Sequence, residues 1–100
     1  MSLDSITTEI RQKLALAPQV NARVKFDMGD DGIVFVDATQ TPAVISHDDA
    51  EADVVLIASA ATFEGLMNGT QDPNMAFMMG KLKIKGSMGL AMKLNSILEG

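Results

Sequence analysis

Residues 46–53, with the sequence SHDDAEAD, contain the chain's single histidine and its densest group of carboxylates. His47 and the carboxylates at positions 48, 49 and 51 are side chains of the kind that bind metal ions. Ser46, His47 and Asp48 are the residue types of a catalytic triad, but a triad brings its members together from separate elements, not from adjacent positions. We therefore predict a solvated connection here, with metal binding as the alternative.

Two segments bracketed by glycine are further candidates for ligand sites. Gly29-Asp30-Asp31-Gly32 carries two carboxylates but lacks the ligand spacing of a calcium loop, so it predicts a hairpin turn. Gly80 and Gly86 are separated by five residues, and no Gly-Lys-Ser follows, which argues against a phosphate-binding P-loop. The chain also has no cysteine, no GxSxG and no GxGxxG. These features predict a protein that is not an enzyme and has no metal or cofactor.

Methionine is the residue type whose distribution is most uneven. Six of the eight methionines lie between Met67 and Met92, in apolar segments punctuated by Gly69, Gly80 and Gly86. The unbranched thioether side chain adapts to neighbours of different shape. Such a stripe therefore indicates either an adaptable core or the lining of a site that accepts ligands of several shapes, and the spacing alone leaves both open.

The first half of the chain changes from a helical period to a strand period. Leu3 to Leu14 carry apolar residues at spacings of three and four, which predicts a helix capped by Asp4 or Ser5 and stopped by Pro18. Apolar and polar residues then alternate over 20–28 and predict a half-buried strand. Residues 33–37 predict its antiparallel partner, 39–46 a weak or edge strand, and 54–58 a strand buried on both faces or nearly so.

The second half predicts two short helices, a strand and a final helix. Ser59 caps the first helix, which ends at Gly69, and Asp72 with Pro73 begins the second, which ends at Gly80. Residues 82–84 alternate with lysines and predict a strand. Ser87 caps the last helix. Its apolar core stripe, with Met88 and Met92 beside it, is Leu90, Ala91, Leu94, Ile97 and Leu98.

This order of elements, without regular βαβ alternation, predicts an α+β sandwich in which helices cover one face of a mostly antiparallel sheet. Residues 80–98 hold four lysines and no acid, although the whole chain has a net charge of −5. Lys81, Lys83 and Lys85 should lie on the uncovered face of the sheet. They form either a solvated surface or a basic patch that meets anionic lipid surfaces or the phosphates of a coenzyme A ester.

The length of 100 residues fits one domain, which we place at residues 1–100. The N-terminus carries acids and no apolar run, and no segment reaches the roughly 18 apolar residues of a membrane span. We therefore expect a cytoplasmic protein. The acidic balance and the absence of Trp and Tyr weigh against nucleic-acid binding.

A long run in the second half resembles a known family. The segment AFMMGKLKIKGSMGLAMKL, residues 76–94, closely resembles the C-terminal half of sterol carrier protein 2 domains. Ala52-Asp53-Val54, the helix that contains Phe63, and Gly69 are similar as well, so the match is dense over 52–98. The first half is similar only as a helix followed by alternating strands. Ser87 stands where many members carry an acid, and no peroxisomal tripeptide ends the chain.

The resemblance implies a five-stranded sheet covered on one side by helices, with an apolar tunnel between them. It implies that the tunnel binds fatty acids, fatty acyl-CoA, phospholipids or sterols. The residues that it implies for the tunnel wall are Phe26, Phe35, Phe63, Leu66, Met67, Phe77, Met78, Leu82, Ile84, Met88, Leu90 and Met92.

Non-catalytic lipid carriage with transient contact with membrane surfaces is therefore the favoured hypothesis. Removing an acyl chain from water contributes roughly 0.8 kcal/mol per methylene group, so even a partly buried chain gains several kcal/mol. The alternative is a protein-interaction or regulatory domain that docks a partner through its methionine-rich surface. Only a lipid carrier should contain an amphiphile when it is purified.

Overall fold

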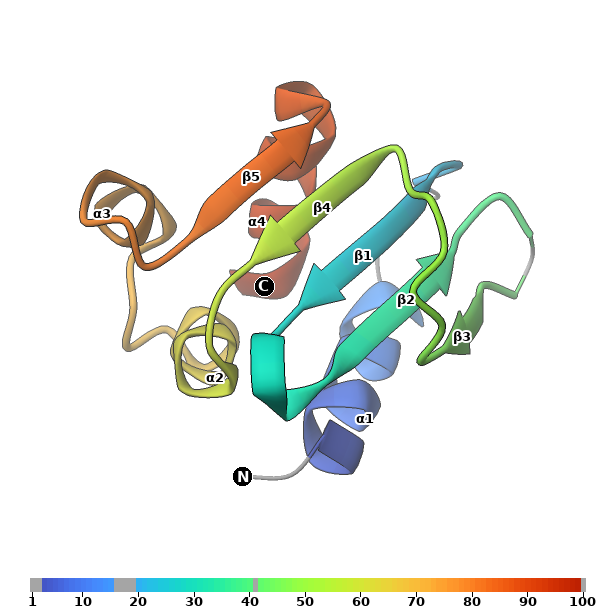
Figure 1. The fold of residues 1–100 in the computed structure, drawn as a ribbon, viewed down its shortest axis with the longest axis horizontal. Helices are drawn as coiled ribbons and strands as arrows, with labels where there is room; N and C mark the ends of the chain where they lie inside the picture. The colour runs from blue at the N-terminus through green and yellow to red at the C-terminus, as the bar shows by residue number, and fades with distance from the viewer. Residues whose placement is uncertain (1–2, 16–19, 41, 100) are drawn as a thin grey trace.

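A computed structural model of the protein describes residues 3–15, 20–40 and 42–99. Figure 1 shows the elements in chain order. They are α1 (Leu3–Ala15), β1 (Arg23–Asp27), a 3-10 turn (Gly29–Asp31), β2 (Ile33–Asp37), β3 (Val44–Ser46), β4 (Val54–Ile57), α2 (Ala60–Asn68), α3 (Pro73–Met78), β5 (Lys83–Gly86) and α4 (Met88–Glu99).

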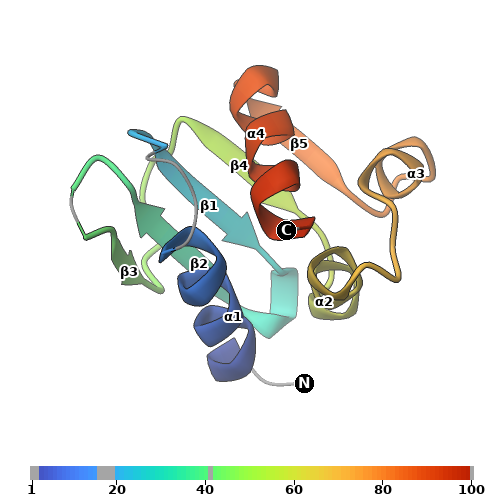
Figure 2. The same ribbon diagram turned by 180° about the vertical axis from the view of Figure 1, so that it is seen from behind.

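The five strands form one sheet in the order β3-β2-β1-β4-β5. Three of the four strand pairings are antiparallel, and β1 and β4 run parallel. Figures 1 and 2 show α1 and α4 lying across one face of the sheet, with α2 in the same layer, while the other face has no helix on it. The predicted α+β fold, with a five-stranded, mostly antiparallel sheet covered on one face by helices, is confirmed.

Alternation along the strands decides which side chains enter the core. Every second residue of a strand points to the same face, so one set of side chains meets the helices. The ring of Phe26 in β1 meets the ring of Phe63 in α2 edge to face, with centroids 5.7 Å apart. The other strand residues in this core are Val24, Val34, Val36, Val54 and Leu56.

The predicted hairpin turn and three predicted helix caps are confirmed. Residues 29–32 connect β1 to its antiparallel partner β2. The Ser59 hydroxyl accepts a hydrogen bond from the backbone N–H of Thr62 at 3.1 Å, and Asp72 accepts two from the first turn of α3. The Ser87 hydroxyl accepts one from the N–H of Leu90 at 3.3 Å. Local sequence therefore fixes where these helices begin.

The predicted cap of the first helix is wrong. The helix α1 already includes Leu3, so Asp4 and Ser5 lie inside its first turn and not before it. The carbonyl oxygen of Asp4 accepts a hydrogen bond from the Thr8 hydroxyl at 2.9 Å, as expected within a helix. Pro18, which we expected to stop this helix, lies outside the described residues.

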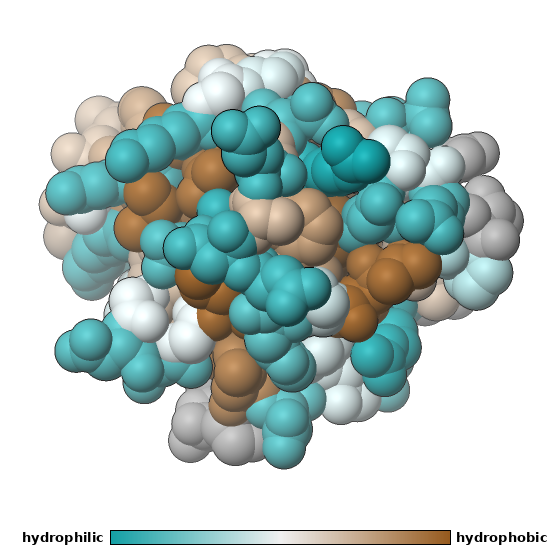
Figure 3. Space-filling view, turned by 45° about the vertical axis from the view of Figure 1, so that its right-hand side comes forward, coloured by the Kyte–Doolittle hydropathy of each residue, from teal (hydrophilic) through white to brown (hydrophobic). Residues whose placement is uncertain are grey.

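The uncovered face of the sheet carries both basic and apolar side chains. Lys83 and Lys85 pair with Ile57 and Val55 of β4, so they lie on this face as predicted. The connection that follows β3 returns over it, because Asp49 forms an ion pair at 2.6 Å with Lys25 of β1. Figure 3, seen obliquely from this face and from β3, shows apolar groups separated by polar ones.

Candidate functional site

Large apolar side chains are exposed mainly at one end of the described chain. Six of the seven most exposed ones lie between residues 75 and 92, and their exposed fractions range from 47% to 79%. They are Met75, Phe77, Met78, Met79, Met88 and Met92. These side chains lie on α3, directly after it and on α4, and groups of exposed apolar side chains commonly mark binding sites. This surface, on α3 and α4, is therefore our candidate site.

The first part of the site is the short helix α3. Pro73 occupies its first turn and the carboxylate of Asp72 caps it, with Oδ1 2.8 Å from the backbone nitrogen of Asn74. Within α3 only Pro73 and Ala76 are buried. Figures 1 and 2 show α3 at the β5 edge of the molecule, apart from the helices on the sheet. Its remaining apolar side chains consequently face outward.

The second part of the site is one flank of α4. The buried stripe of this helix is formed by Ala91, Leu94 and Leu98. At 100° per residue, positions 88, 92 and 95 fall together on one side of that stripe. Leu90 and Ile97 fall on the other side and pack against the core. We call Met88, Met92 and Asn95 the methionine flank of α4.

The methionine flank faces the β5 edge of the sheet. Figure 2 shows α1 on one side of α4 and β5 with α3 on the other side. The helix starts at the end of β5 and packs its buried stripe onto the sheet. A right-handed helix in this position turns the methionine flank toward β5 and α3. On β5, Ile84 pairs with Leu56 and so lies on the helix-covered face, where it is half-buried.

Asn95 is a polar member of this flank that our sequence reasoning missed. Its Oδ1 atom is buried and has no hydrogen-bond partner among the described residues. Leaving a buried carbonyl oxygen unpaired costs about 1–3 kcal/mol, so such an atom calls for a specific explanation. The sequence contains a signal for this residue, because an amide side chain lies next to the apolar stripe of the last helix, three residues after Met92.

The structure distributes the twelve predicted wall residues over three environments. Buried in the core, between the sheet and the helices, are Phe26, Phe63, Leu66, Met67 and Leu82, with Ile84 and Leu90 packed against them. Exposed on α3 and α4 are Phe77, Met78, Met88 and Met92. Phe35 lies elsewhere.

Phe35 lies on the opposite face of the sheet. It pairs with Lys25, whereas Phe26 pairs with Val34, so the two phenylalanines point to opposite sides. Phe35 is buried, but it is not part of the core under the helices. It therefore cannot share a wall with Phe26, and we remove it from the candidate site. The sequence signal that separates the two phenylalanines is the register of the predicted hairpin, which places residues 26 and 35 on opposite faces of the sheet.

The acidic connection does not form a metal centre in the described structure. His47 Nε2 lies 3.2 Å from the Thr7 hydroxyl oxygen, and Asp49 pairs with Lys25. Among residues 3–15, 20–40 and 42–99, no three His, Asp or Glu side chains are grouped so that they could hold a metal ion. The same ranges contain no helix that is long and apolar enough to cross a membrane.

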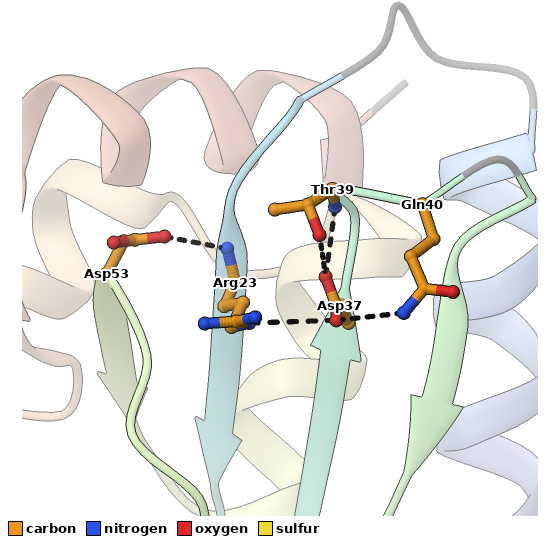
Figure 4. Close-up of polar contacts among 5 residues, drawn as sticks. All are labelled: Arg23, Asp37, Thr39, Gln40 and Asp53. Carbon is orange, nitrogen blue, oxygen red and sulfur yellow. Dashed lines mark hydrogen bonds and ion pairs between the residues drawn. The ribbon is translucent and has the colours of Figure 1, made fainter.

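A polar cluster joins the ends of the strands near Asp37 (Figure 4). Asp37 accepts hydrogen bonds from the side chain and the backbone N–H of Thr39 and from Gln40, and its Oδ2 lies 3.6 Å from Nε of Arg23. The Thr39 hydroxyl, more than any other neighbour, lowers the pKa of Asp37. The Arg23 backbone N–H also donates to Asp53 at 2.9 Å. These partners already satisfy the hydrogen-bonding capacity of the ionised Asp37 carboxylate, as expected for a residue with a structural role.

Comparison with protein families gives one match across nearly the whole chain. The SCP-2 sterol transfer family matches residues 3–99. Hydroxysteroid dehydrogenase-like protein 2 of Xenopus tropicalis is 54% identical over 48 residues, which are 48% of this chain and 12% of that protein. Sterol carrier protein 2 of Homo sapiens is 44% identical over 55 residues, 55% of this chain and 10% of that protein. The chain thus matches only about a tenth of the length of these two relatives.

Solved structures show the same fold. The NMR structure of palmitated SCP2L2 from Aedes aegypti superposes with a TM-score of 0.71 at 21% identity, covering 100% of this chain and 96% of that one.

Proposed function

The chain belongs to the SCP-2 sterol transfer family, and from this premise we propose that it binds and carries lipids without catalysing a reaction. The ligands that we propose contain a long acyl chain, as fatty acids, acyl-CoA esters and phospholipids do. The palmitated state of the Aedes aegypti relative supports an acyl chain as the ligand. We also propose that residues 1–100 act as one domain in this process.

The observation that carries this proposal is the exposed apolar surface of α3 and α4. Ile84 of β5, which lies between α3 and α4 in the chain, packs against the buried core. An acyl chain laid against this surface and continued under α4 would leave water, at roughly 0.8 kcal/mol per methylene group. Methionine side chains suit this role because they adapt to chains of different length and shape.

The proposed cavity lies between the sheet and α4. Its inner wall consists of side chains from the helix-covered face of the sheet, from α2 and from the residue before β5. Its outer wall comes from α4. The inner residues are Phe26, Phe63, Leu66, Met67, Leu82 and Ile84. The outer residues are Met88 and Met92, whereas Leu90 packs against the core on the other side of the buried stripe of α4. Phe77 and Met78 of α3 stand at the entrance.

Uptake of a fluorescent fatty acid tests this assignment. In Met92→Asp, a carboxylate replaces an apolar side chain that is 68% exposed, so folding should be little affected while an acyl chain meets a charge. We expect uptake to fall at least tenfold. Val44→Asp is the matched control, because Val44 is exposed on β3, at the other edge of the sheet from β5. Unchanged uptake by a folded Met92→Asp variant would exclude the methionine flank from the site.

Native mass spectrometry of the purified protein distinguishes this function from the alternative, a domain that docks a protein partner. That alternative is favoured by Met78, which is 79% exposed on the projecting helix α3. A lipid carrier should be purified with bound amphiphile. A protein-docking domain should show the mass of the chain alone and no fatty-acid uptake.

We also propose that the exposed surface of α3 meets an anionic membrane when the lipid is exchanged. Lys81, Lys83 and Lys85 follow α3 directly and are exposed. The segment 80–98 contains four lysines and no acid, so it complements an anionic bilayer although the whole chain is acidic. Methionine and phenylalanine side chains on α3 would enter the interface beside these lysines.

A further inference from the structure

We propose that Asn95 makes the site prefer lipids whose head group carries a hydroxyl donor over lipids whose head group offers only acceptors. This inference rests on the proposed lipid-binding function and narrows the class of ligand. It concerns an atom that neither the fold nor the core packing accounts for.

The position of Asn95 connects it with the site. It follows Met88 by seven residues and Met92 by three, so it shares the methionine flank of α4. Its angular position lies closer to the buried stripe of Leu94 and Leu98 than that of Met92 does. The burial agrees, because Asn95 is half-buried whereas Met92 is 68% exposed. Asn95 therefore lies deeper in the site than the methionine beside it.

The chemistry of the free atom decides what it can bind. Oδ1 of Asn95 is a carbonyl oxygen and only accepts hydrogen bonds. It is buried and has no donor among the described residues. A lipid hydroxyl supplies that donor and removes the cost of the unpaired oxygen. An ether or ester head group has no donor, and an ionised carboxylate brings only further acceptors, so both leave Oδ1 unpaired.

The selectivity follows from this difference. Sites built around a buried polar atom discriminate well against an otherwise equal ligand that cannot pair with it. We therefore expect a long-chain alcohol to bind about tenfold more tightly than an ether of the same length. The apolar remainder of both molecules makes the same contacts, so the head group alone decides the ratio.

The experiment compares 1-dodecanol with methyl undecyl ether, which has the same number of heavy atoms and no donor. Each displaces a fluorescent dodecanoic acid from the wild-type chain, from Asn95→Leu and from Ser96→Ala. Asn95→Leu keeps the side-chain shape and removes the acceptor. Ser96→Ala is the matched control, because Ser96 is the next residue of the same helix and is exposed.

We expect a tenfold preference for the alcohol in the wild type and in Ser96→Ala, and equal binding of both probes in Asn95→Leu. Equal binding of alcohol and ether to the wild type would overturn the inference, and no variant would be needed to show it. Equal binding is the result expected if a water molecule already donates to Oδ1. A preference that survives in Asn95→Leu would overturn it as well. If the wild type takes up neither the fluorescent acid nor either probe, the proposed lipid function itself fails, and this inference with it.

Discussion

At the scale of single residues, Asp37 shows how neighbours hold a carboxylate in its charged form. Hydrogen bonds from Thr39 and Gln40 and the charge of Arg23 stabilise the anion, and they outweigh the opposing effect of burial. The resulting pKa lies below the usual value of 3.8. The contribution of this cluster to stability is therefore complete above pH 3.8 and is lost as the pH falls through the pKa of the folded state.

Thr39→Ala should raise the pKa of Asp37 toward 3.8, because the hydroxyl of Thr39 is the largest cause of the lowering. Gln40→Ala should raise it less, since the Gln40 amide contributes less. Titration of the side-chain carboxyl carbon by NMR measures both changes. A larger rise in Gln40→Ala than in Thr39→Ala would show that the hydroxyl does not dominate.

The residue scale also separates two kinds of apolar side chain that look alike in the sequence. Phe63 is 1% exposed and packs on Phe26, whereas Phe77 is 47% exposed. Both fall in apolar segments of the second half, and both belong to the predicted wall. Their difference arises because α2 lies among the other helices while α3 projects at the edge of the sheet.

At the scale of elements, β5 joins the sheet through a glycine that no other residue can replace without cost. Gly86 has a φ of 96°, and a Cβ atom there would collide with the carbonyl oxygen of Asp53 before β4. Gly69, at the end of α2, has a φ of 83°, but a Cβ atom there would meet open space. The two glycines share one backbone preference, and only Gly86 adds a steric barrier.

Gly69→Ala should therefore lower the free energy of unfolding by about 1–2 kcal/mol, the cost of a left-handed residue that is not glycine. Gly86→Ala should lower it by more, because β5 must also move away from β4. Urea denaturation of the two variants measures the difference. An equal loss in both would mean that β4 and β5 adjust to the added methyl group without strain.

At the scale of the whole molecule, charge and exposed apolar surface are unevenly distributed. The segment 80–98 is basic and follows the exposed helix α3, while residues 1–79 contain twelve acids and four basic residues. Electrostatic attraction to an anionic surface falls off within about one Debye length, roughly 10 Å at 0.1 M salt. In the proposed exchange of lipid with a membrane, the basic segment therefore contributes only when it faces the bilayer.

Binding to vesicles that contain phosphatidylserine should accordingly fall as the salt concentration rises. Lys81→Gln should weaken it roughly fivefold, from about 1 kcal/mol for a lysine near an anionic surface. Met78→Ser should weaken it by removing an apolar side chain from the interface, and Val44→Ser on β3 is the matched control. Vesicle sedimentation measures all three. If the chain bound vesicles of phosphatidylcholine alone as well as vesicles that contain phosphatidylserine, the charge-based part of the proposal would be wrong.

The sequence by itself determined the elements and the places where most of them begin. Ser59, Asp72 and Ser87 cap helices because each acts on a backbone N–H only two or three residues away. Alternation over a few residues likewise fixed the lysine-bearing face of β5. The predicted cap of α1 was wrong because several residues suitable for capping lie close together near its start, and a local pattern does not choose between them.

Only the tertiary structure decided how these elements meet. The parallel pairing of β1 with β4 joins residues such as Arg23 and Asp53, which are 30 positions apart, and no local period encodes that contact. Packing between distant segments also made α3 project (Figure 1) and left Asn95 Oδ1 buried without a partner among the described residues. Side-chain patterns act over one turn or one strand pair, whereas burial depends on which surfaces the whole fold brings together.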